Sequence, residues 1–101
     1  MVTHPIHVTR DGYRGSNPSK RAKANEINRI ASELEQYING LLAVQEQSIQ
    51  MYIYDQIAQA TNTPVAIVRK LCMAIDGGSN GFTAIKPGLT YEQAMAEMKA
   101  K

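Results

Sequence analysis

A chain of 101 residues, of which 44% are hydrophobic, has the length of one domain and the composition of a soluble globular protein. It contains no apolar run near the roughly 20 residues that cross a membrane, and its first residues lack the basic and apolar segments of a secretory signal. Its single cysteine, Cys72, rules out an internal disulfide, so we expect a cytoplasmic protein.

The net charge of +2 is unevenly spread along the chain. Residues 1–24 hold five basic residues against one acidic residue, whereas residues 25–60 hold five acidic residues against one basic residue. Basic arms bind nucleic-acid phosphates, although a solvated, poorly ordered N-terminus would have the same composition. The basic residues of the first segment are Arg10, Arg14, Lys20, Arg21 and Lys23.

Residues 1–16 contain Pro5, two glycines and few apolar side chains. We therefore expect them to form an extended, flexible basic arm, and residues 17–101 to form a single helical domain.

A long helix is expected to begin at Asn17 and Pro18, because Asn is a good N-cap and Pro suits the first helical position. Apolar residues then recur every three or four positions up to Leu41, which is the pattern of one helical face. Gly40 indicates the end, so the helix should span about residues 18–39. Its apolar stripe is either the core side of the domain's own helix or the seam of a dimer.

The next segment is expected to form helices at about 41–47 and 51–61, or one longer irregular helix, with Val44 and Ile53 among its core residues. The run Met51–Tyr54 has the local character of a strand. Its continuation into residues DQIAQA favours a helix.

A further helix should start at Pro64, with Thr63 as its N-cap, and end at Gly77. Residues 81–85 (GFTAI) are typical of a short strand, and residues 90–93 (TYEQ) form a capping box that opens a last helix. The predicted fold class is mainly α, with one short strand and a C-terminal helix.

The stretch from residue 57 to residue 71, IAQATNTPVAIVRKL, contains the residue types that a helix-turn-helix needs. Ala58 is small where a second helix would cross closely, and Asn62 tolerates a left-handed backbone at the corner. Val68 and Leu71 would lock the second helix against the first.

This spacing, over about residues 54–75, resembles that of the helix-turn-helix superfamily of bacterial and phage DNA-binding proteins. The resemblance implies that the helix at 64–75 is a recognition helix in the major groove. Arg69 would pair with guanine or hold a phosphate, and Lys70 would do either as a point charge. The alternative is that both are ordinary exposed residues of a surface helix. The residues that the resemblance places at DNA are Thr63, Pro64, Ala66, Arg69, Lys70 and Met73.

Winged-helix members of that superfamily add a two-stranded ribbon after the recognition helix. Here only residues 81–85 make a convincing strand. We expect a partial wing, unless a segment near residues 49–52 or the N-terminal arm pairs with that strand.

No pattern in the sequence points to catalysis, a metal or a cofactor. His4 and His7 lack the further ligands that a metal site needs. Cys72 follows an apolar residue in a predicted helix, where a buried and inert thiol is expected. We therefore expect a protein that is not an enzyme.

Two functions remain open at this stage. The first is a small DNA-binding protein, a homodimer that acts as a transcriptional regulator or an accessory factor of a phage or plasmid. The second is a protein-interaction module, such as a phage inhibitor or adaptor, which would use the apolar helix faces to bind a protein partner.

Overall fold

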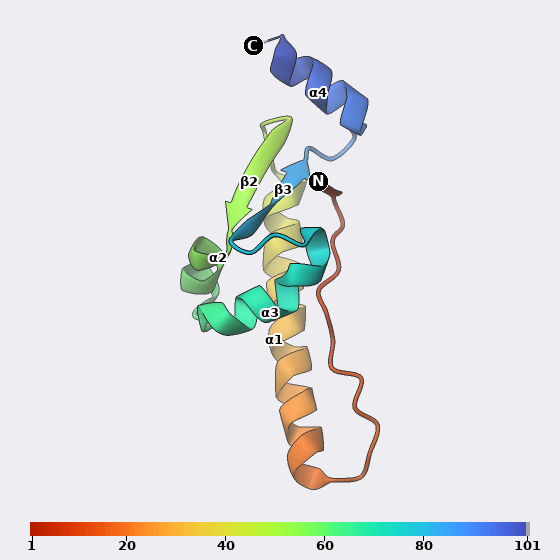
Figure 1. Ribbon diagram of the computed structural model, residues 1–101, viewed down its shortest axis with the longest axis vertical. Helices are drawn as coiled ribbons and strands as arrows, with labels where there is room; N and C mark the ends of the chain where they lie inside the picture. The colour runs from red at the N-terminus through yellow and green to blue at the C-terminus, as the bar shows by residue number, and fades with distance from the viewer. Residues whose placement is uncertain (101) are drawn as a thin grey trace.

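The computed structural model describes residues 1–100, in which helices hold 55% of the chain and a small sheet lies beside them (Figure 1). The fold is mixed α/β and more than half helical, which agrees in part with the expected mainly α class, but the sheet has three strands rather than the single strand that we expected. The elements in chain order are β1 (Val2–Thr3), α1 (Pro18–Ala43), β2 (Ile49–Ile53), α2 (Tyr54–Thr61), α3 (Val65–Asp76), β3 (Gly81–Ile85) and α4 (Tyr91–Lys99).

Helix α1 begins as expected, because the Asn17 side chain accepts hydrogen bonds from the amides of Ser19 and Lys20. It does not stop at Gly40 but continues to Ala43, so no separate helix forms at 41–47. Its apolar stripe is the core side of the domain. Three members of this stripe, Ile27, Ile30 and Leu41, are only partly buried against the core. Its fully buried members are Ala31, Leu34, Ile38 and Leu42.

The segment Ile49–Ile53 is a strand, β2, so the expectation that the second helix starts at residue 51 is wrong. Helix α2 starts only at Tyr54. The strand is stabilised by its partner across the sheet, because the ring of Tyr52 stacks on that of Phe82 with centroids 5.4 Å apart. The Tyr52 hydroxyl is also satisfied, since it donates to Gln45 Oε1 over 2.8 Å.

Strand β3 is the centre of the sheet, whose order is β1-β3-β2. It pairs antiparallel with β2 and parallel with β1, so both segments that we considered as its partners pair with it. Gly81 lies close against the backbone of β2. A Cβ at this position would lie 2.1 Å from the carbonyl oxygen of Tyr52.

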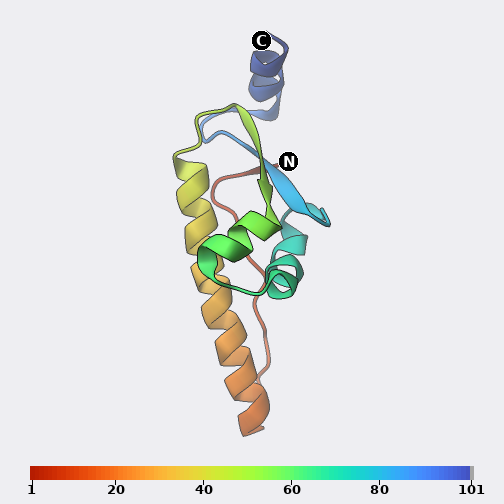
Figure 2. The ribbon, with the colours of Figure 1, turned by 90° about the vertical axis from the view of Figure 1, so that its left-hand side faces the viewer.

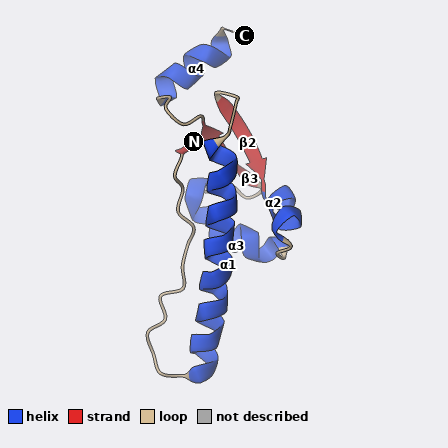
Figure 3. Ribbon diagram, turned by 180° about the vertical axis from the view of Figure 1, so that it is seen from behind, coloured by secondary structure: helices blue, strands red, loops and turns tan. Residues whose placement is uncertain are grey.

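Residues 1–16 are extended, as expected, but they are not a free arm. Figure 3 shows them running alongside α1 towards the sheet. Ile6 and Val8 are buried in the core, and the amide of Thr9 donates to the carbonyl of Leu71 in α3 over 3.3 Å. The arm therefore forms part of the domain, and the boundary that we placed at residue 16 does not separate two independent units.

The molecule is elongated, with extents of 56 × 24 × 22 Å. Figure 2 shows α2, α3 and the sheet together on one side of α1. The first turns of α1 and the loop before them project at one end, and α4 projects at the other (Figure 1). Helix α4 opens with the expected capping box between Thr90 and Gln93. Among the described residues, no helix combines the length and apolar character needed to cross a membrane.

Candidate nucleic-acid interface

The corner between α2 and α3 is made by Asn62, which has the expected left-handed backbone (φ 51°, ψ 43°). The amide of Thr63 donates to the carbonyl of Ala58 over 3.0 Å, and the amide of Asn62 donates to that of Gln59 over 3.4 Å. This pair of bonds is the Schellman ending of a helix, which satisfies the last carbonyls of α2 and turns the chain sharply.

The side chains that join α2 to α3 are those expected from the sequence. Ile57 and Ala58 of α2 are buried, as are Val68 and Leu71 of α3. The start of α3 differs by one position, because Pro64 is the N-cap and Val65 the first helical residue. The hydroxyl of Thr63 caps nothing and donates instead to the carbonyl of Thr61 over 3.2 Å.

The outer face of α3 is open to solvent. Ala66, Arg69, Lys70 and Met73 are all exposed, and Met73 leaves half of its surface uncovered. Arg69 and Lys70 are adjacent in the chain, so they point about 100° apart around the helix and flank this face on its two sides. Within residues 1–100, neither has a carboxylate within ion-pairing distance.

The start of α3 lies beside an acidic part of α1. A hollow at the corner is lined by Thr63 and Pro64 on one side and by Glu26, Arg29 and Glu33 on the other. Arg29 binds both carboxylates, at 2.5 Å and 2.7 Å, and its hydrogen bond to Glu26 lowers the pKa of that carboxyl group. Two carboxylates against one guanidinium leave a net negative charge, which disfavours a phosphate beside Thr63.

The projecting end of the molecule is a basic hairpin, formed by residues 11–17 and the first turns of α1. Asn28 holds it closed, because its Oδ1 accepts from the amide of Asp11 over 2.7 Å and its Nδ2 donates to the carbonyl of Asp11 over 3.0 Å. The hydroxyl of Tyr13 accepts from the amide of Asn17 over 3.2 Å, and the ammonium group of Lys20 lies 6.0 Å from the centroid of the Tyr13 ring.

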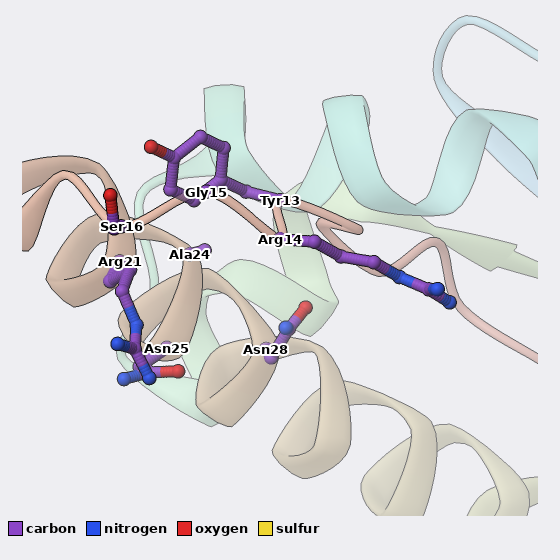
Figure 4. Close-up of a pocket in the computed structure, with 8 residues that line it drawn as sticks. All are labelled: Tyr13, Arg14, Gly15, Ser16, Arg21, Ala24, Asn25 and Asn28. Atoms are coloured by element: carbon purple, nitrogen blue, oxygen red, sulfur yellow. The ribbon is translucent and has the colours of Figure 1, made fainter.

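A polar hollow of about 360 Å³ lies in this hairpin. Arg14 from the loop and Arg21 from α1 line it and extend in different directions (Figure 4). Ser16, Asn25 and Asn28 add uncharged polar groups to the lining.

The basic residues of the arm fall into two groups. Arg14, Lys20 and Arg21 are at the hairpin, whereas Arg10 and Lys23 line a second hollow together with Lys70 of α3. The structure thus brings part of the predicted basic arm against the predicted recognition helix and leaves the rest at the end of the molecule.

Three polar residues of α1 that hold the arm were not expected from the sequence. Glu35 accepts from the amide of Val8 over 2.9 Å and pairs with Arg10 at 3.1 Å. Asn39 binds the backbone of Ile6. Asn28, Glu35 and Asn39 are seven and four positions apart, which places them on one side of the helix. That spacing was the available signal.

The other residues with reactive or metal-binding side chains are not assembled into a site. Cys72 is buried, as expected, and burial raises the pKa of its thiol to about 11. No three His, Cys, Asp or Glu residues come together as metal ligands anywhere in the described chain. No protein-family model, curated protein or solved structure matches this chain.

Proposed function

We propose that this protein binds double-stranded DNA as a small helix-turn-helix protein, with α3 in the major groove. The observation that carries the proposal is the open face of α3, which follows a left-handed corner at Asn62 and adjoins the basic residues of the arm. A regulator of transcription, or an accessory factor of a phage or plasmid, would use such a surface.

In this proposal the residues on the outer face of α3 have chemical roles. Arg69 donates to guanine or to a phosphate, and Lys70 contacts the backbone at the side of the groove. Ala66 and Met73 make apolar contacts with base edges. Pro64 starts the helix next to the groove, and Thr63, whose hydroxyl is bound within the chain, supports the corner.

The basic hairpin gives the second contact. Arg14, Lys20 and Arg21 project from the body on an arm that is held by hydrogen bonds to α1. They would lie along phosphates or enter the minor groove next to the helix site. A single recognition helix reads few base pairs, so we propose a homodimer that binds two half-sites about one helical turn apart.

The test is a mobility-shift titration with random-sequence duplex DNA at low and physiological salt, on protein whose mass in solution is measured in the same buffer. Binding that weakens steeply with salt supports the proposal. The double variant Arg69→Ala/Lys70→Ala should lose affinity, and Lys99→Ala in α4 should not. If the double variant stays folded and binds like the wild type, α3 does not read DNA.

A protein-interaction module is the second candidate, and exposed apolar residues favour it. Met51 and Ile53 are exposed on β2, which is an edge strand, and Tyr91 and Met98 are exposed on α4. An apolar interface of this kind would tolerate salt. Failure to bind DNA at low salt, together with salt-resistant capture of a partner that Met51→Ser abolishes, would favour this second function.

A further inference from the structure

The hollow between the arm, α1 and α3 is built from three parts of the chain. Arg10 comes from the arm, Lys23 and Ile27 from α1, and Lys70 and Leu71 from α3. Its volume is about 170 Å³. The amide of Thr9 donates to the carbonyl of Leu71 over 3.3 Å, which holds the arm against α3 at this point.

The charges around the hollow leave two lysines without a carboxylate partner. Arg10 pairs with Glu35 at 3.1 Å, so its charge is largely balanced. Asp11 also lines the hollow, but its carboxylate accepts from the amide of Tyr13 over 3.0 Å. Neither Lys23 nor Lys70 forms an ion pair within residues 1–100, so the rim of the hollow is net positive.

The rest of the lining comes from Thr9, Ile27 and Leu71. Leu71 is only 2% exposed, so the half-buried Ile27 supplies the accessible apolar surface. Lys23 and Lys70 have long aliphatic stems that extend this apolar surface. An apolar surface with two cations at its rim matches one repeat of a nucleic-acid backbone, in which an apolar sugar face adjoins an anionic phosphate.

We propose that Lys23 and Lys70 hold one and the same DNA phosphate, with the adjacent deoxyribose against Ile27 and the aliphatic stem of Lys70. This inference rests on the proposed function and adds one phosphate contact to it. We call Lys23 and Lys70 together the clamp. The clamp would set the position of α3 along the groove, because a phosphate contact fixes register and orientation without reading sequence. It would also tie the arm to the recognition helix when DNA is bound.

The experiment is a double-variant cycle on binding to a random-sequence duplex, in which affinity is measured over a range of salt concentrations. The variants are Lys23→Gln, Lys70→Gln and their combination. Each lysine on its own phosphate would lower the slope of log affinity against log salt by about 1. A shared phosphate predicts that the combined variant lowers the slope by about 1 rather than about 2, and that its loss of affinity differs from the product of the two single losses.

Two controls keep the outcome specific. The pair Lys20→Gln and Lys70→Gln joins the hairpin to α3, and its effects should multiply. Lys23→Arg keeps the charge and should retain the wild-type slope. Thermal unfolding of every variant checks that these exposed substitutions leave the fold intact.

The experiments distinguish a failure of the proposed function from a failure of the clamp alone. Wild-type protein that binds no DNA at low salt overturns both the proposed function and the clamp. Wild-type binding that depends on Arg69, combined with fully multiplicative effects at Lys23 and Lys70, overturns only the clamp. Effects at Lys23 and Lys70 that do not multiply, together with multiplicative effects in the control pair, support the clamp.

Discussion

Asn39 holds the backbone of Ile6 on both sides: its Oδ1 accepts from the Ile6 amide over 2.8 Å, and its Nδ2 donates to the Ile6 carbonyl over 3.1 Å. The side chain of Ile6 is buried in the core. One amide side chain of α1 thus satisfies both polar groups of a residue whose side chain must be inside.

Replacing Asn39 by Ala should lower the free energy of unfolding by about 1–3 kcal/mol, because two partly buried backbone groups lose their partner. Chemical denaturation measures this change. Asn25→Ala, at an exposed position of the same helix, is the matched control and should change stability by less than about 0.5 kcal/mol. Equal effects at the two positions would show that the arm is not held by Asn39.

The environment of Glu35 predicts that the stability of the protein falls at low pH. The hydrogen bond from the Val8 amide, and then the charges of Arg10 and His7, lower the pKa of this carboxyl group from 4.5. A carboxyl group with a lowered pKa in the folded state stabilises the protein at higher pH. This contribution is lost as the pH falls below about 4.5 and through the lower pKa of the folded state.

The measurement is the free energy of unfolding between pH 6 and pH 3 for the wild type and for Glu35→Gln. The variant should show a shallower loss of stability over this range. Glu46→Gln, in the exposed loop after α1, should retain the wild-type slope. An unchanged slope in Glu35→Gln would contradict the stabilising role of the Glu35 carboxylate.

Gly81 should not tolerate a side chain. A Cβ there would lie 2.1 Å from the carbonyl oxygen of Tyr52 and 3.1 Å from the Cα of Ile53, so the strands would have to separate. We expect Gly81→Ala to destabilise the protein by about 3 kcal/mol, since overpacking against backbone cannot be relieved by side-chain rotation. Gly12→Ala, where a Cβ would meet no atom within 4 Å, is the control and should melt within a few degrees of the wild type.

Substitutions of Asn62 test whether the corner between α2 and α3 depends on the left-handed backbone at this position. Its left-handed conformation costs a residue with an ordinary Cβ about 1 kcal/mol, whereas glycine adopts it freely. Asn62→Ala should therefore be about 1 kcal/mol less stable than Asn62→Gly in thermal or chemical unfolding. Two variants of equal stability would mean that residue 62 leaves the left-handed region when Asn is replaced.

The elements that could be predicted from the sequence have local signals. Asn17 and Pro18 start α1, Gly77 ends α3 with a φ of 68°, and Thr90 opens α4, each through the chemistry of its own residue type. The corner at Asn62 belongs to the same class. These features depend on neighbours only a few positions away, so a single sequence contains the necessary information.

The elements that could not be predicted depend on distant partners. Strand β2 forms because β3 lies beside it, and the arm is ordered because α1 offers Asn28, Glu35 and Asn39. Val44 and Ile53 were expected in the core but are 73% and 37% exposed. Ile53 lies in β2, where successive side chains alternate between the two faces of the sheet. Because we expected a helix there, we assigned the wrong residues to the inward face.

The basic arm shows the same limit at the candidate interface. Its charges could be read from the sequence, but Lys23 and Lys70 are far apart in the chain and meet at one hollow only in the folded molecule. Arg10, one of the predicted phosphate contacts, pairs with Glu35 and is therefore not a free cation.

The pairing of β1 with β3 joins Val2 to Ala84, which are 82 positions apart in the sequence. On the ribosome, β1 is therefore synthesised well before the strand that pairs with it. Native contacts between such distant segments slow folding, so a nascent chain halted before residue 81 would lack the strand with which β1 pairs, and its sheet would remain incomplete.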